Sequence, residues 1–138
     1  MTADSQLALQ ASVLTALRST GALTALLGNG SNGVLDHVPE NTAYPYVVIG
    51  ESRGRPFDTK TEQGMEQTLT IHSWSRYRGM KELKEIMAAV VAALDRQSLS
   101  IVGHSLVLLQ FESSETQLDR DGLTRHGLQR FRALTEAN

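Results

Sequence analysis

The sequence predicts an α+β fold, in which an antiparallel β-sheet of about four to five strands carries an N-terminal helix and a long helix on one face. Two long segments, Met65–Ser75 and His104–Gln117, alternate apolar and polar residues, as a strand with one buried face does. Between them, Gly79–Arg96 repeats apolar residues at the spacing of an amphipathic helix. Consecutive strands joined by tight turns pair antiparallel, which leaves the helices to cover one face of the sheet.

The first half of the chain supplies the N-terminal helix and two further strands. Apolar residues at helical spacing predict a helix over Asp4–Arg18 and one more helical turn over Ala22–Leu27. A short apolar piece, Val34–Val38, follows a glycine-rich turn. The β-branched run Tyr46–Glu51 predicts a strand. The charged segment Arg53–Gly64 contains a proline and two glycines, so we expect an extended hairpin loop there.

The last part of the chain predicts a hairpin. An Asp-Gly turn at Asp119–Gly122 separates His104–Gln117 from a final strand over Leu123–Leu134. A chain of 138 residues has the length of one domain, which we expect to span residues 1–138.

The composition excludes several classes of function. The chain has no cysteine, so it has neither a disulfide nor a thiol nucleophile. Its net charge of -2 and pI of about 6.1 give no long-range attraction to nucleic acid or to an anionic membrane. No apolar run approaches the roughly 20 residues that a membrane span requires. We therefore expect no membrane partner.

Two motifs resemble parts of enzymes but lack the necessary context. Gly28–Gly33 matches G-x-G-x-x-G, yet a predicted helix precedes it and a strand follows, which is the reverse of a dinucleotide site. Gly103–Val107 begins like a nucleophile elbow but lacks its final glycine. The sequence therefore predicts no catalytic residue and no cofactor, and a small hydrolase is the less favoured alternative.

The four histidines do not form a metal-binding pattern. His37, His72, His104 and His126 lie on separate segments, whereas zinc needs three or four converging ligands. His72 is able to approach His104 or His126 across neighbouring strands, and the sequence leaves this open. The expectation is that no metal binds.

A sheet with one buried face and one solvent-exposed face does not explain the positions of two leucines. By strand parity, Leu106 and Leu108 lie opposite Val107 and Leu109, so the strand is apolar on both faces at its start. Either another helix or a neighbouring subunit must cover the second face. We expect Leu106 and Leu108 to be interface residues.

The final strand carries a basic stripe on an acidic protein. Its members are Arg125, His126, Arg130 and Arg132, of which the three arginines are the candidate contacts. They either lie on a solvated face, paired with Glu112 and Glu115 of the preceding strand, or contact a partner protein or the phosphates of passing DNA. A small DNA-binding protein is therefore another alternative.

An ordered set of motifs covers nearly the whole chain and resembles a known family. The motifs are Leu23–Gly28, Asp36–Pro39, Tyr44–Gly50, Thr68–Ser75 and Asp121–Gly127, the last leading into Arg130–Ala133. In this order and spacing they are similar to the small tail-completion proteins, or tail terminators, of long-tailed phages and phage-like gene transfer agents.

The resemblance implies a structural role in a virion or phage-like particle, at the junction of tail and head. Such proteins form a ring, usually hexameric, on the end of the tail tube. The ring stops tube growth and offers a face to the head-side connector, while DNA passes through its channel. The family has no known enzymatic role or cofactor. Another head–tail connector, such as a stopper or adaptor, is the nearest alternative.

The resemblance also gives the charged segment 53–64 a role. A ring needs two different patches that meet between neighbouring copies. We expect Arg53, Arg55, Phe57 and Lys60 to contact a neighbour or the tube, with Phe57 at the tip of the loop.

Overall fold

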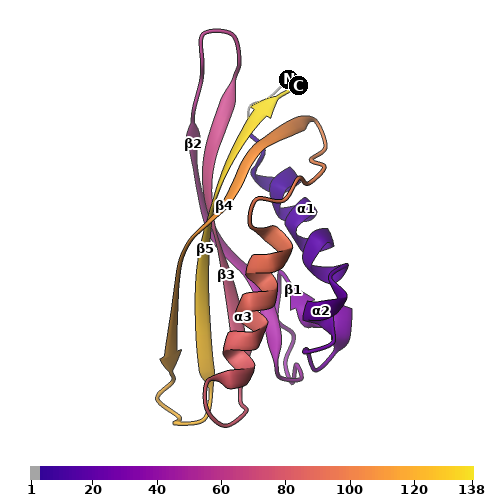
Figure 1. Ribbon diagram of the computed structural model, residues 1–138, viewed down its shortest axis with the longest axis vertical. Coiled ribbons are helices and arrows are strands. Elements are labelled where there is room, and N and C mark those ends of the chain that lie inside the picture. Colours follow the sequence, from indigo (N-terminus) through magenta and orange to yellow (C-terminus); the bar gives the residue numbers. More distant parts are fainter. Residues whose placement is uncertain (1–3) are drawn as a thin grey trace.

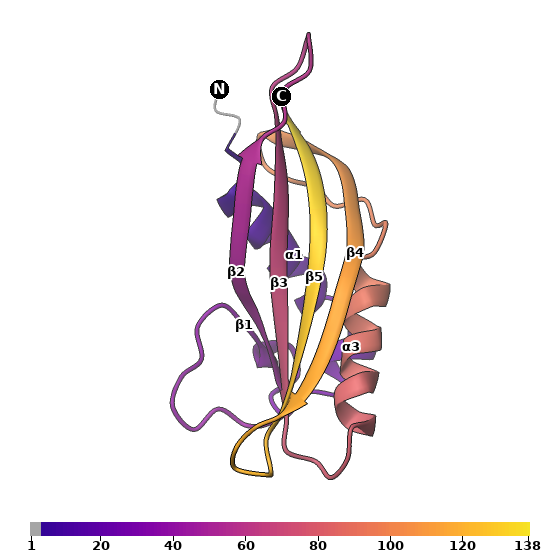
Figure 2. The ribbon, with the colours of Figure 1, turned by 90° about the vertical axis from the view of Figure 1, so that its left-hand side faces the viewer.

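A five-stranded twisted sheet with helices on one face forms the body of the protein (Figures 1 and 2). The computed structural model describes residues 4–138, so residues 1–3 of the expected domain lie outside the described residues. The strand order across the sheet is β1-β2-β3-β5-β4. The strands are β1 (Val34–Leu35), β2 (Tyr46–Pro56), β3 (Gly64–Ser75), β4 (His104–Leu118) and β5 (Arg125–Ala137). The helices are α1 (Gln6–Arg18), α2 (Gly21–Thr24), the 3-10 helix η1 (Gly30–Gly33) and α3 (Lys81–Leu94).

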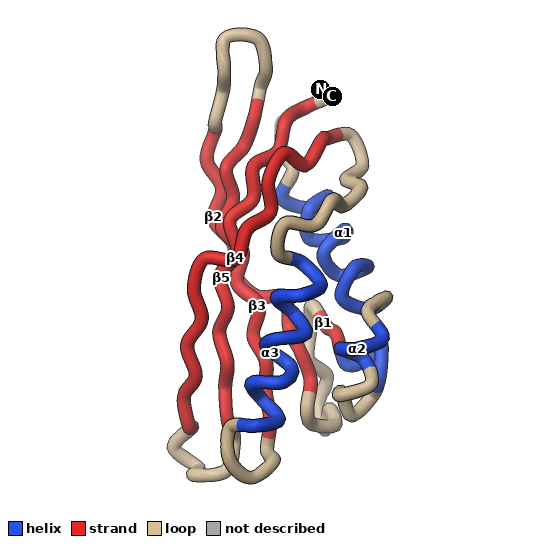
Figure 3. The backbone as a smooth tube through the Cα atoms, viewed as in Figure 1, coloured by secondary structure: helices blue, strands red, loops and turns tan. Residues whose placement is uncertain are grey.

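The α+β fold predicted from the sequence is confirmed, with one difference in strand direction. The pairs β2–β3, β3–β5 and β4–β5 are antiparallel, whereas the two-residue β1 pairs with β2 in parallel. A parallel neighbour needs a long connection, and residues 36–45 supply it as a loop (Figure 3). The sheet is therefore mixed rather than wholly antiparallel.

The core lies between the sheet and the helices α1 and α3. Leu69 and Ile71 of β3 and Phe131 of β5 point into it and are almost fully buried. Leu9 and Val13 of α1 pack against them, as do buried residues of α3. The alternation predicted for Met65–Ser75 therefore places its apolar parity against the helices and its polar parity on the opposite, uncovered face, which we call the open face.

A polar cluster ties the beginning of α1 to the sheet. The Oγ atom of Ser5 lies 2.5 Å from the Oγ1 atom of Thr135 and accepts a hydrogen bond of 2.6 Å from Nε2 of Gln67. All three residues are buried. The hydroxyl of Ser5 thus bonds the sheet instead of capping the helix, because buried polar groups need partners.

The β2–β3 hairpin projects beyond the helices as an arm, residues 53–66 (Figure 1). Residues 53–56 belong to β2, so the expected loop over 53–64 is shorter, and the connection is residues 57–63. Phe57 donates its backbone N–H to the carbonyl of Gly64 at 2.9 Å, which places it at the base of this connection. Lys60 lies at the tip, between Thr59 and Glu62, whose backbones are hydrogen bonded.

Two irregularities in β4 change which residues share a face. The register with β5 shifts between Leu106 and Leu108 and again between Phe111 and Ser113. Leu106 therefore packs against the core, and Val107 is exposed. The expectation that Leu106 lies with Leu108 on the second face is wrong, because each bulge inserts one residue and inverts the parity that follows it.

Candidate interface on the open face of the sheet

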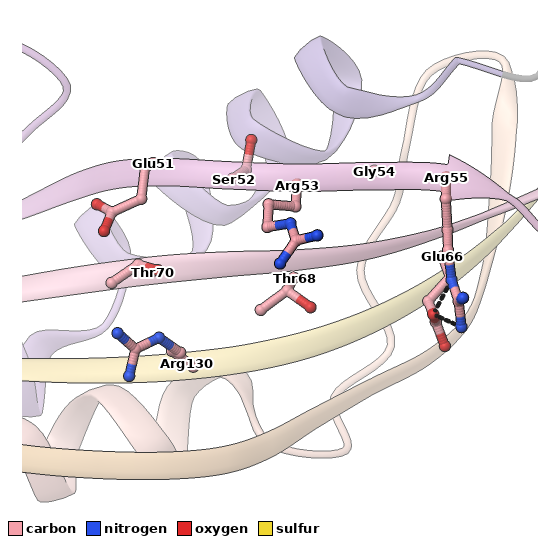
Figure 4. Close-up of a pocket in the computed structure, with 9 residues that line it drawn as sticks. All are labelled: Glu51, Ser52, Arg53, Gly54, Arg55, Glu66, Thr68, Thr70 and Arg130. Carbon is pink, nitrogen blue, oxygen red and sulfur yellow. Dashed lines mark hydrogen bonds and ion pairs between the residues drawn. The ribbon is translucent and has the colours of Figure 1, made fainter.

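A shallow groove of about 550 Å³ runs over the open face, across β2, β3 and β5 (Figure 4). Its lining alternates charged side chains with hydroxyl groups. The residues that line it are Glu51, Ser52, Arg53, Gly54, Arg55, Glu66, Thr68, Thr70 and Arg130. Every one comes from the two strands of the arm or from β5, so the strand register builds the groove.

Glu66 holds two arginines at one end of this groove. Nε of Arg55 donates to Oε1 of Glu66 at 2.6 Å, and Nε of Arg132 donates to Oε2 at 2.7 Å. Each guanidinium also brings a terminal nitrogen within 2.6 Å of the same oxygen. The hydrogen bonds from Arg132 and then from Arg55 lower the pKa of the Glu66 carboxyl, so this carboxylate stays charged at neutral pH.

The predicted basic stripe is divided by the fold. Arg130 and Arg132 lie on the open face, and Arg130 contacts Glu115 at 3.4 Å, as one alternative expected. Arg132 pairs with Glu66 instead of Glu112. Arg125 has the opposite parity and donates to the backbone carbonyls of residues 77 and 123, at the end of the sheet. The three arginines therefore do not form one stripe.

Arg53 is the unpaired cation of the groove. Its guanidinium has no hydrogen-bond or ion-pair partner among residues 4–138. It lies over Thr68, while Arg130 lies further along beside Thr70 and Glu51 (Figure 4). The middle of the groove is consequently positive, whereas the carboxylates at its ends lie beside arginines.

A row of rings lies on the open face beyond Glu51. Nδ1 of His72 is 2.7 Å from Nε2 of His126, and Nε2 of His72 is 2.7 Å from Oε1 of Glu51. His126 stacks on Trp74, with ring centroids 3.8 Å apart and planes 2° apart. Of the alternatives left open for His72, the structure selects His126, because β5 rather than β4 is the neighbour of β3.

The ring row alters the acid–base properties of its members. Desolvation by burial, followed by the neighbouring His72, lowers the pKa of His126. The hydrogen bond from His72 lowers the pKa of Glu51. His126 is therefore held neutral, and Glu51 charged, over a wider range of pH than in an unfolded chain.

The remaining motifs occupy structural positions. Asp121 accepts hydrogen bonds from the backbone and the hydroxyl of Thr124, which lower its pKa to about 2 and fix the β4–β5 turn. The glycine-rich segment 28–33 is a turn with the helix η1, between α2 and β1. Ser105 starts β4 and donates to the side chain of Asn138 at 2.7 Å.

Residues 4–138 contain neither a metal-binding cluster nor a membrane-spanning helix. No group of three or more His, Cys, Asp or Glu side chains in that part of the chain is arranged to hold a metal ion. The helices described there are too short or too polar to span a membrane.

The sequence places Glu66 on the polar face of its strand, but it did not identify Glu51, Glu66 or Trp74 as site residues. The alternation of β3 indicates this face: Glu66 and Trp74 are separated from His72 by even numbers of residues, so all three side chains project on the same side of the strand. The carboxylate partners of the arginines depend on the β3–β5 register, which only the folded sheet provides.

Three comparisons relate this architecture to known proteins. Residues 11–136 match the sequence family described as "Tail completion protein gp17". Tail completion protein gp17 of Bacillus phage SPP1 is 32% identical over 101 residues, which are 73% of this chain and 75% of the relative. A chain from a virion of a native gene transfer agent particle is 28% identical and superposes with a TM-score of 0.88, covering 99% of this chain and 100% of that one.

Proposed function

The chain belongs to the tail completion protein gp17 family, and from this premise we propose that it forms a ring that caps the head-proximal end of a phage-like tail tube. It is a structural component of a phage or gene transfer agent tail. In the proposed role the ring is hexameric, stops polymerisation of the tube protein and gives the head-side connector its docking face. The observation that carries the proposal is the near-complete superposition on a chain of an assembled gene transfer agent virion.

The arm supports a ring, because a ring is built from two different patches that meet between copies. A hairpin that projects from the body is able to reach a neighbouring copy or the tube (Figure 2). We assign this contact to the arm residues Arg53, Arg55, Phe57 and Lys60, which are all exposed. Leu108, on the open face beside β5, is the remaining apolar contact residue.

The charges of the open face support passage of DNA without tight binding. Arg130 and Arg132 are the candidate channel contacts, and both already have carboxylate partners. A cation that is paired with a carboxylate releases fewer counterions from DNA, so it contributes less to affinity. A net charge of -2 acts in the same direction.

The experiment is electron microscopy of particles made by cells that lack this gene. Under the proposal, tails are overlong or variable in length and are detached from filled heads, because nothing stops the tube. Restoring the gene is the control and returns tails to a uniform length.

Two results would overturn the proposal. Tails of normal length that fail only at the head junction would make the protein a stopper or adaptor. Intact particles that still transfer DNA would remove it from tail completion and favour the hydrolase or DNA-binding alternatives.

A further inference from the structure

The sheet has two uncovered edges, one on each side. Beyond Val48, no described strand pairs with the outer side of β2, and residues 51–56 are all exposed. On the other side, the segment after α3 covers β4 only as far as Phe111: Arg96 N–H donates to the Leu109 carbonyl, and Asp95 accepts from Phe111 N–H. Residues 112–118, which follow, are all exposed. We call these segments the β2 edge and the β4 edge.

Unpaired strand edges attract other strands, since each one presents a row of free N–H and carbonyl groups. Soluble proteins protect such edges with charges, proline and bulges. Pro56 ends the β2 edge, and a bulge precedes the β4 edge. These devices limit which strand is able to pair but do not remove the free backbone groups.

The two edges carry opposite charges. The β2 edge contains Arg53, Arg55 and one carboxylate, Glu51, so it is positive overall, and Arg53 has no partner among the described residues. The β4 edge contains Glu112 and Glu115, and the single contact of Glu115 is the 3.4 Å one to Arg130. Opposite charges across a strand pair are favourable, and like charges are unfavourable.

The charge signs disfavour pairing of an edge with itself. Two β2 edges would bring two segments with an excess of positive charge together, and two β4 edges, whose only charged side chains are glutamates, would bring glutamate against glutamate. A β2 edge against a β4 edge places cations beside carboxylates. Such a contact joins two different patches, which is the heterologous contact that closes into a ring.

The directions and faces of the strands agree with this pairing. In the order β2-β3-β5-β4, with antiparallel neighbours, β2 and β4 run in opposite directions, so a second copy that continues the sheet adds an antiparallel pair. Arg53 is level with Thr68, and Glu115 is level with Leu128, which is in register with His72; all lie on the open face. Their side chains therefore project on the same side of the joined sheet.

We propose that neighbouring copies join edge to edge, with the β2 edge of one copy added to the β4 edge of the next, so that the sheet continues from subunit to subunit. This inference rests on the proposed ring and identifies the contact between its neighbouring subunits. Each free segment is the later half of its strand, and β2 and β4 run in opposite directions, so the two free segments lie at opposite ends of the sheet. Successive copies must therefore be shifted along the strand direction for these segments to pair. Strands tilted against the ring axis accommodate such a stagger, as they do in a barrel.

The test uses the absence of cysteine from the native chain. One variant carries both Arg53→Cys and Glu115→Cys, and two others carry one change each. Each replaces the native gene, and purified particles are oxidised and analysed by non-reducing electrophoresis. The double variant should give a ladder longer than a dimer, whereas each single variant should stay monomeric. A matched control pair, Lys81→Cys with Thr15→Cys, lies at exposed positions on α3 and α1, rather than on either edge, and should give no ladder.

Charge reversal provides an independent test. Arg53→Glu, which breaks no ion pair among the described residues, should lower particle yield, and adding Glu112→Lys should restore it. Dimers in a single-cysteine variant would show like edges pairing and would overturn the proposal. The proposal would also be overturned if particles of the double variant had tails of normal length but gave no ladder. That result would leave the proposed role in tail termination intact. Cross-links from the β2 edge to a different protein would replace the second copy with that partner.

Discussion

The Nδ1 atom of His72 lies 2.7 Å from the Nε2 atom of His126, so the two imidazoles share one proton along this contact. Oε1 of Glu51 lies at the other ring nitrogen of His72, which allows His72 to donate to Glu51 and accept from His126, or to donate to both when charged. A second charge on His126 would break the contact, because both facing nitrogens would then be donors.

The first prediction concerns pH. Burial and His72 lower the pKa of His126 below its ordinary value of 6.5, so the folded chain binds this proton less readily than the unfolded chain. The free energy of unfolding should therefore be fully maintained above pH 6.5 and should fall as the pH is lowered beneath it. Urea denaturation between about pH 7.5 and 5.5 measures this, in a range where carboxylates remain charged.

His126→Phe isolates the contribution of that histidine. Phenylalanine keeps a ring on Trp74 but takes no proton, so the pH dependence should become flatter. His37→Phe, in the exposed loop after β1, is the control and should follow the native curve. Parallel curves for His126→Phe and the native chain would contradict the prediction.

The second prediction concerns the buried hydroxyl that joins the two ends of the chain. Ser5→Ala should lower the free energy of unfolding by about 1–3 kcal/mol, since it leaves polar groups of Gln67 and Thr135 buried without that partner. Chemical denaturation gives the value. Ser12→Ala, which removes an exposed hydrogen bond to the Ser100 carbonyl, should change stability by about 0.5 kcal/mol or less. Equal effects of the two substitutions would refute the assignment.

The third prediction concerns the carboxylate between Arg55 and Arg132. Glu66→Gln removes the charge that pairs with both guanidiniums, so duplex DNA should bind more tightly to the variant than to the native chain. The slope of log affinity against log salt should steepen by up to about 2, close to one for each freed cation. Fluorescence anisotropy with a labelled duplex measures both quantities.

A matched substitution separates local pairing from net charge. Glu85→Gln removes the partner of Lys81 on α3 and changes the net charge by the same amount. It should leave DNA affinity close to that of the native chain. An equal gain in both variants would mean that net charge, rather than the open face, governs DNA contact.

Periodicity predicted β3 well and β4 poorly, for a physical reason. β3 pairs with β5 without a register shift, so alternation along Met65–Ser75 reports its two faces directly. In β4, the bulges near Val107 and Glu112 invert the parity twice, which is why Leu106 was placed on the wrong face. Nothing in the local sequence marks a bulge that lacks glycine.

The end of β2 in the arm was not predicted from the sequence. Arg53 and Pro56 lie in a segment whose charges and glycine indicated a loop, yet both belong to β2. This part of β2 buries no apolar face, so its sequence lacks the alternating apolar residues that identify a strand. Backbone pairing with β3 extends the strand instead, from Arg53 opposite Thr68 to Pro56 opposite Met65. Candidate residues of the arm were found by their charge, but the partner of Arg55 was not.

The place of β5 in the sheet has a consequence for synthesis. This strand, Arg125–Ala137, is synthesised after β2, β3 and β4, yet it lies between β3 and β4. Until it has emerged, β4 has no neighbouring strand among the described elements, and the sheet ends at β3. A chain that is cut short before Arg125 therefore lacks both β5 and a positioned β4. Under the proposed edge-to-edge contact, such a truncated product has no positioned β4 edge and should not join a neighbouring copy.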